Sequence, residues 1–149
     1  MISIQKILDS DFNEFLDLMK GFYSYSGDGE ATSEIMRPLF DKATDPATNF
    51  HVFVANNGKK LVGLISITIG ESSYRVSSFA WADDFYVDSD FRGQGVGGKL
   101  MSAAADFAKS LGCSNVLVGV GFGEEDTLKF YSNNGFKDMA CKLLTLPLK

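Results

Sequence analysis

The sequence contains little of what metal or thiol chemistry requires: its 149 residues include one histidine and two cysteines. Cys113 and Cys141 lie far apart and form no C-x-x-C pair, so we expect free, buried thiols and no metal site. A Ser-His-Asp triad would need His51, and nothing near His51 in the sequence supports one. We therefore interpret His51 as an ordinary strand residue.

Long apolar runs and clusters of basic residues are also missing. No run of about 18 apolar residues is present, and Met1–Lys6 lacks the pattern of a signal peptide. These absences predict a cytoplasmic protein that binds no membrane. The net charge of −5 without a basic patch argues against a nucleic-acid partner and weakly favours a cationic substrate. The length predicts one domain, residues 1–149.

Glycine, by contrast, is concentrated where an apolar strand ends. Residues 87–100 read Val-Asp-Ser-Asp-Phe-Arg-Gly-Gln-Gly-Val-Gly-Gly-Lys-Leu, so a glycine-rich turn follows the strand and an amphipathic helix begins inside the turn. Backbone N–H groups at a helix N-terminus attract anions, and glycine lets a phosphate approach the backbone. The pattern therefore predicts a cradle for a pyrophosphate.

Three motifs compete for this turn. The dinucleotide pattern G-x-G-x-x-G fits, but the next strand, 115–120, ends in no acidic residue that could hold a ribose. A phosphate-binding loop of nucleotide hydrolases is nearly present, but Leu100 stands where a magnesium-binding hydroxyl is needed. The pattern R/Q-x-x-G-x-G/A is matched completely by residues 92–97.

Hydrophobic periodicity predicts the order β, α, α, β, β, β, glycine turn, α, β, α, β. Asn56-Asn57-Gly58 indicates a hairpin between two strands, and Gly21 to Gly27 is expected to break the first helix. A long strand is expected from about Arg75 to Val87. Residues 136–146 are expected to form a final hairpin-like return.

Two further segments complete a resemblance to a known family. Phe130–Phe136 is similar to F-Y-x-x-x-G-F, and Asp84–Val87 resembles the d-L-x-V that precedes the turn. With the turn itself, these motifs resemble the GNAT N-acetyltransferase superfamily along almost the whole chain. The resemblance implies an α+β fold (α/β in some schemes). Its mixed, mostly antiparallel sheet would have six to seven strands, splayed between strands 4 and 5 and flanked by about four helices.

The resemblance also implies roles for individual residues. Tyr131 would be the general acid toward the leaving thiolate, and Asp84 and Asp83 would be general bases or amine anchors. Adjacent strand residues point to opposite faces, so without a bulge only one of the two aspartates can face the cleft. Phe22, Tyr23 and Tyr25, together with Asp83, would line the acceptor site. Acetyl-CoA would be bound by Phe85, Tyr86, Val87, Arg92, Gly93, Gln94, Gly95, Val96, Gly97, Gly98, Thr127 and Phe130.

One position departs from the family pattern. Glu124 stands seven residues before Tyr131, where the family often carries an asparagine, and a carboxylate cannot donate an amide N–H. The cofactor contact made there is therefore lost or taken over by Thr127.

The expected function is N-acetylation of a primary amine by acetyl-CoA through direct attack in a ternary complex. The amine is expected to be a small cation of the polyamine or diamine type, or a peptide amine. The alternative is a sensor of the same fold that binds acyl-CoA without turnover. A homodimer through apolar residues 139–146 is an additional expectation.

Overall fold

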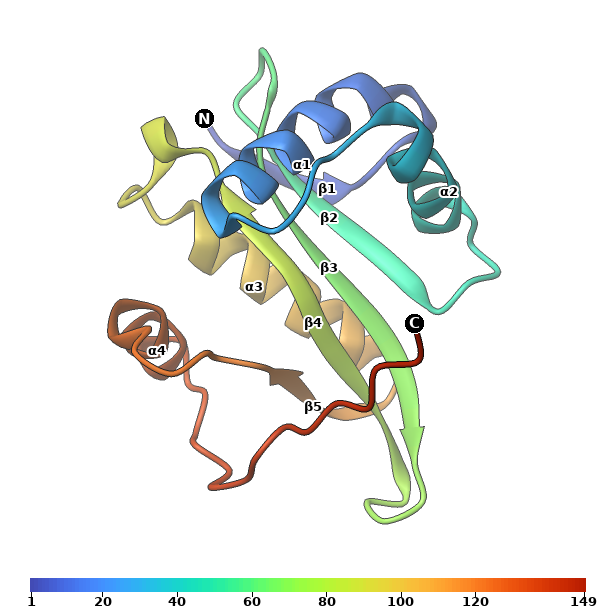
Figure 1. The fold of residues 1–149 in the computed structure, drawn as a ribbon, viewed down its shortest axis with the longest axis vertical. Coiled ribbons are helices and arrows are strands. Elements are labelled where there is room, and N and C mark those ends of the chain that lie inside the picture. Colours follow the sequence, from blue (N-terminus) through green and yellow to red (C-terminus); the bar gives the residue numbers. More distant parts are fainter. The chain divides into compact units, whose positions relative to one another are not determined.

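A computed structural model describes residues 1–149 and divides them into two compact units, residues 1–117 and 118–149, which are described separately. Five strands form one sheet in the order β1-β2-β3-β4-β5 (Figure 1). Their bounds are Ser3–Lys6 for β1, Phe50–Asn56 for β2, Leu61–Ser72 for β3, Ser77–Val87 for β4 and Cys113–Val118 for β5. Strands β1 to β4 pair antiparallel.

Strand β5 returns to the sheet after a helical crossover. The hydroxyl of Ser114 lies 2.7 Å from that of Ser77 and 3.5 Å from the carbonyl oxygen of Ser78. These contacts place the start of β5 beside the start of β4, so the two strands begin side by side. A strand–helix–strand connection of this kind makes the sheet mixed.

Helices cover both faces of the sheet. Helices α1 (Phe12–Ser26) and α2 (Ser33–Thr44) pack on one face, and α3 (Val96–Ser110) packs on the other (Figure 1). Alternation along β2 explains this arrangement, because successive side chains point to opposite faces. Val52 and Val54 join the core under α1 and α2, whereas the ring of His51 lies 4.8 Å from that of Phe107 in α3.

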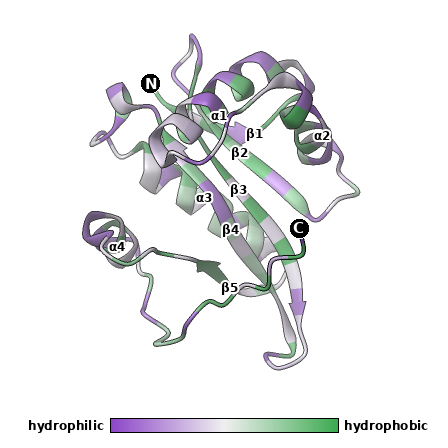
Figure 2. Ribbon diagram, in the orientation of Figure 1, coloured by the Kyte–Doolittle hydropathy of each residue, from purple (hydrophilic) through white to green (hydrophobic).

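Hydrophobic residues run along the central strands, in agreement with the burial of nearly all of β2 and the first half of β3 (Figure 2). His51 is a buried strand residue, as expected, and burial lowers its pKa, with a further contribution from Lys6. The hairpin at Asn57 and Gly58 is confirmed: the Asn57 N–H donates to the Lys60 carbonyl, and Gly58 has a φ of 87°.

Several boundaries differ from the expectation. Helix α1 continues through Gly21 and ends at Ser26, where Gly27 adopts the left-handed conformation. Strand β4 begins at Ser77 instead of near Arg75, so the turn before it lies at residues 73–76. Both thiols are free, but Cys141 is exposed and Cys113 is only partly buried, so the expectation of buried thiols is wrong.

The expected six to seven strands are also a wrong prediction, since the sheet has five. Residues 136–149 form no strand, and most of them are exposed, including Met139 and the leucines at 143, 144, 146 and 148. A strand needs the backbone of a neighbour to pair with, and an apolar pattern alone does not supply one.

The second unit contains helix α4 (Glu125–Asn133) and the segment that follows it. Glu125 and Asp126 place negative charge on the first turn of α4, where the helix dipole favours it. None of the four helices combines the length and the apolar character of a membrane span.

Candidate active site

The glycine turn and the start of α3 form an array of unpaired backbone donors. Gly93 and Gly95 have φ angles of 72° and 77°, a conformation that glycine adopts without strain. The N–H groups of residues 93–98 donate no hydrogen bond to the protein, and the first such bond runs from the Lys99 N–H to the Gly95 carbonyl. Six successive free donors at a helix N-terminus can hold an anion, and a pyrophosphate at this turn stays a prediction.

The entrance to this turn is fixed by Asp88. Its N–H donates to the carbonyl of Val62 at 2.9 Å, and its carboxylate accepts from the N–H of Asp90 and from Nζ of Lys60, each at 3.1 Å. The Asp90 hydrogen bond is the main cause that lowers the pKa of Asp88, and Lys60 and Arg92 contribute. The carboxylate is therefore ionised and joins β4, the following turn and the β2–β3 hairpin.

Arg92 is bound to protein groups on two other elements. Its Nε donates to the carbonyl of Val87 at 2.8 Å. Its guanidinium carbon lies 4.8 Å from the ring centroid of Tyr25 and 5.5 Å from that of Tyr86. The structure thus brings together two residues expected to contact the cofactor, Arg92 and Tyr86, and one expected to contact the acceptor, Tyr25.

The two aspartates of β4 lie at a break in the strand register. Ile65 pairs with Phe85 and Ile67 with Ala82, so one residue of β3, Ser66, faces both Asp83 and Asp84. This is the geometry of a β-bulge, and it removes the simple alternation of faces. Asp83 is exposed, whereas Asp84 is half-buried.

Ser66 is a site residue that the sequence reasoning missed. Only 1% of it is exposed, and its Oγ accepts a hydrogen bond from the Asp84 N–H at 2.9 Å and donates one to the Asp84 carboxylate at 3.1 Å. Burial and the charge of Asp83 raise the pKa of Asp84, and the hydrogen bond from Ser66 opposes them. A hydroxyl within an otherwise apolar strand was the available signal, because buried hydroxyls need partners.

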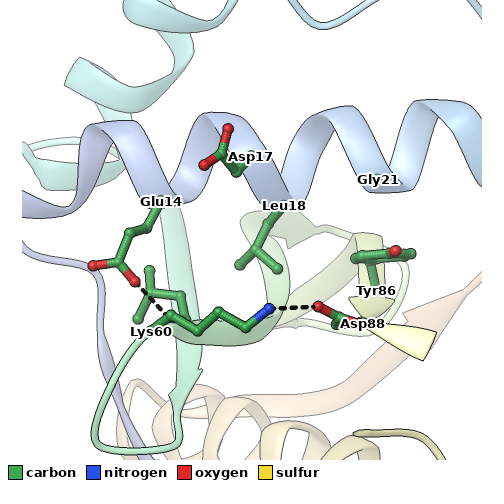
Figure 3. A pocket seen from close by; sticks show the side chains of 8 residues that line it. Glu14, Asp17, Leu18, Gly21, Lys60, Tyr86 and Asp88 are labelled. Carbon is green, nitrogen blue, oxygen red and sulfur yellow. Dashed lines mark hydrogen bonds and ion pairs between the residues drawn. The ribbon is translucent and has the colours of Figure 1, made fainter. Parts of the chain in front are cut away.

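A pocket of about 230 Å³ lies beside the end of β4 (Figure 3). Glu14, Asp17 and Gly21 of α1 line one side, and Lys60 and Asp88 lie on the other. Glu14 accepts a hydrogen bond from the N–H of Leu61, which fixes α1 to the start of β3. This group could not be predicted from the sequence, since its members come from separate elements and match no motif.

The aromatic residues at the end of α1 differ in surroundings. The ring of Phe22 lies 6.3 Å from that of Tyr86 and 5.8 Å from that of Tyr23, and Phe22 and Tyr23 are both partly buried. Tyr25 is 69% exposed and faces Arg92. Phe22 and Tyr25 therefore adjoin the end of β4 and the glycine turn.

In the second unit, Tyr131 is a buried residue of α4. Its ring lies 5.5 Å from that of Phe130 and 5.2 Å from that of Phe136. Burial and then the charge of Glu124 raise the pKa of Tyr131, so its phenol stays protonated at neutral pH. The Glu124 carboxylate also accepts a hydrogen bond from the Gly121 N–H at 2.8 Å, and Thr127 is partly buried one turn before Tyr131.

Comparison with known proteins decides the family. Residues 12–136 match the model of the acetyltransferase (GNAT) family. The chain belongs to the GNAT family. This match includes the glycine turn, the paired aspartates and the Tyr131 motif. It confirms the sequence-based assignment to the GNAT family, which uses acetyl-CoA.

One relative of this GNAT chain is an uncharacterized N-acetyltransferase of Methanocaldococcus jannaschii. The two are 31% identical over 87 residues, which is 58% of this chain and 38% of that protein. The chain thus spans little more than a third of the length of the relative that it matches.

Solved structures share the GNAT fold over nearly the whole chain. An aminoglycoside acetyltransferase from an uncultured soil metagenomic sample, in complex with trehalose, has a TM-score of 0.82 and 25% identity, covering 99% of this chain and 97% of that one. Glucosamine-6-phosphate N-acetyltransferase from Arabidopsis thaliana has a TM-score of 0.80 and 22% identity, covering 98% of each chain. These similarities confirm the α+β GNAT fold.

Proposed function

We propose that this GNAT protein transfers the acetyl group of acetyl-CoA to a primary amine, most favourably a small cationic amine, by direct attack in a ternary complex. The observation that carries the proposal is the row of six unpaired N–H groups at residues 93–98. Groups of this kind fit a diphosphate, and no side chain at Gly93 or Gly95 blocks the approach. Residues 85–87 would hold the pantetheine arm between β4 and β5, where the family resemblance implies that the two strands splay apart.

Acetyl-CoA supplies a thioester whose carbonyl carbon the amine nitrogen attacks. In the proposed reaction the new N–C bond forms, the C–S bond breaks, nitrogen loses a proton and sulfur gains one. Asp84 is assigned as the base that takes the proton, directly or through water, and its raised pKa suits it for that role better than an ordinary carboxylate. Asp83, exposed beside it, is assigned to anchoring the cationic amine.

Tyr131 is assigned as the acid that returns a proton to sulfur. Its pKa is raised, so the phenol is protonated whenever the reaction runs near neutral pH. A phenol whose pKa lies above ~10 is a weaker acid than a thiol of pKa ~8.5, so transfer of its proton to a free thiolate is uphill and must be coupled to the breaking of the C–S bond. Thr127 and Phe130, on the same helix, are assigned to cofactor contacts.

The proposal that the acceptor is a cationic amine rests on the negative charge of the protein. The chain carries a net charge of −5, and the acidic side chains of Asp83 and Asp84 lie on the strand that precedes the cofactor turn. Such a field concentrates cations near the site. The aminoglycoside acetyltransferase among the structural neighbours also carries the name of a polycationic amine substrate. Peptide amines are the second class to include.

The test is thiol release from acetyl-CoA with a panel of spermidine, putrescine, kanamycin, amino acids and a peptide with a free N-terminus. Amine-dependent release with a cationic member supports the proposal. Tight acetyl-CoA binding with no release across the panel instead identifies a sensor of the same fold. Thiol release only with the peptide would instead identify a peptide amine as the acceptor.

We also propose that residues 139–146 form a contact with a second copy of the chain. Met139 and the leucines at 143, 144 and 146 are more than half exposed, which is unusual for a group of large apolar side chains. Light scattering after size exclusion should give a dimer mass, and Leu144→Glu combined with Leu146→Glu should give a monomer. A monomeric wild-type chain would contradict this contact.

A further inference from the structure

A side chain in the last turn of α1 contacts the residue that precedes the glycines of the turn. Tyr25 is the penultimate residue of α1, and its ring faces the guanidinium group of Arg92 at 4.8 Å. Arg92 directly precedes Gly93, the first of the six unpaired N–H donors. A shift of the Arg92 backbone would therefore also shift the first of these N–H donors.

The other contacts of Arg92 come from β4. Its Nε donates to the carbonyl of Val87, and its guanidinium group also lies over the ring of Tyr86. These contacts hold the base of the side chain against the strand, and Tyr25 faces the same guanidinium from the helix. Arg92 thus links β4 to α1, and Tyr25 supplies the contact on the helix side.

Helix α1 meets β4 through the side chain of Tyr86. A β-carbon at Gly21 would lie 2.7 Å from the Tyr86 hydroxyl, so the helix backbone and the Tyr86 side chain are in close contact (Figure 3). Phe22 contacts the same ring edge-on at 6.3 Å. Gly27 caps the C-terminus of α1, so Tyr25 lies on the last turn of the helix.

We propose that Tyr25 is a positioning residue for the diphosphate of acetyl-CoA, acting through Arg92, and not a residue that contacts the amine. This inference rests on the proposed function of the glycine turn. Its physical basis is the cation–π contact, whose loss at an exposed position changes an equilibrium by a factor of about two to five. The ring, not the hydroxyl, makes the contact, so phenylalanine should replace tyrosine here.

The experiment compares Tyr25→Ala and Tyr25→Phe with Tyr74→Ala as the matched control. Tyr74 is 94% exposed in the turn before β4 and has no contact with Arg92. Two quantities are measured: the Kd for acetyl-CoA, and hydrogen exchange at the N–H groups of Asp88, Phe91 and Arg92, which are hydrogen-bonded in the free protein.

Tyr25→Ala should weaken acetyl-CoA binding roughly two- to five-fold and speed exchange at the three amides by a similar factor. Tyr25→Phe and Tyr74→Ala should match the wild type in both. Unchanged binding and unchanged exchange in Tyr25→Ala would overturn the inference while leaving the proposed function intact. If the wild-type chain does not bind acetyl-CoA, the proposed function fails, and the assignment of Tyr25 to a diphosphate fails with it.

Discussion

The hydroxyl of Ser66 closes a ring with Asp84: it accepts from the Asp84 N–H at 2.9 Å and donates to the Asp84 carboxylate at 3.1 Å. This donated bond is the one factor that lowers the pKa of Asp84, against burial and Asp83, which raise it. Ser66→Ala should therefore move that pKa further upward. It should also destabilise the protein by about 1–3 kcal/mol, because it leaves the Asp84 N–H without an acceptor.

The pKa shift is measured by carbon-13 NMR of the aspartate carboxyl groups, with Asp84→Asn to assign the signal. Ser102→Ala, at an exposed position of α3, is the control for loss of a serine hydroxyl. Because a raised pKa means that the folded state binds this proton more tightly than the unfolded state, stability attributable to Asp84 is greatest at low pH. It is lost as pH rises through the folded pKa. A downward shift in Ser66→Ala would contradict the reasoning.

The features that could be predicted from the sequence are those set by residues close together along the chain. The donor row at residues 93–98 follows from the local order of strand, glycines and helix, and the hairpin at Asn57-Gly58 follows from turn chemistry. The contact between Ser66 and Asp84 could not be found in this way, because it depends on a bulge that pairs residues 18 positions apart. The missing strands after Phe136 show the same limit, since periodicity does not reveal whether a partner strand exists.

A second prediction concerns Gly21, which lies inside α1 although glycine costs about 1 kcal/mol relative to alanine in a helix interior. A β-carbon there would lie 2.7 Å from the hydroxyl oxygen and 3.0 Å from Cζ of Tyr86. Gly21→Ala should therefore destabilise the protein, because overpacking of about 1–3 kcal/mol outweighs the gain in helix propensity.

Chemical denaturation of Gly21→Ala, Tyr86→Phe and the double variant measures the coupling between the two positions. Removing the hydroxyl relieves the shortest contact, so alanine at position 21 should cost less in the Tyr86→Phe background. An increase in stability for Gly21→Ala in the wild-type background would show that the Tyr86 ring moves aside freely.

A third prediction separates backbone strain from ligand binding. Gly95 and Gly58 both have positive φ angles, 77° and 87°, and a β-carbon at either would meet no atom within 4 Å. Alanine at either position should thus cost about 1–2 kcal/mol of stability, from backbone strain alone. Only Gly95→Ala should also weaken acetyl-CoA binding, because Gly95 lies in the donor row and Gly58 lies at a hairpin tip. Equal effects of both variants on the Kd would argue against the turn as the diphosphate site.

A fourth prediction tests Tyr131 as the acid. Tyr131→Phe removes the proton donor and keeps the ring that packs on Phe130 and Phe136, so kcat should fall about 100-fold or more while the fold is retained. Circular dichroism checks the fold. A kcat equal to that of the wild type across the pH range would exclude Tyr131 as the acid.

The ionisation of Tyr131 gives an independent measurement of its surroundings. Burial and Glu124 both raise its pKa, so in the wild type the phenol should ionise only above the usual value of ~10. The difference in phenolate ultraviolet absorbance between wild type and Tyr131→Phe isolates this one phenol. Glu124→Gln removes a negative charge and keeps an oxygen for the Gly121 N–H, so it should lower the pKa of Tyr131. If kcat is limited by proton donation from this phenol, Glu124→Gln should also bring the alkaline fall in kcat to lower pH, because Tyr131 then loses its proton earlier.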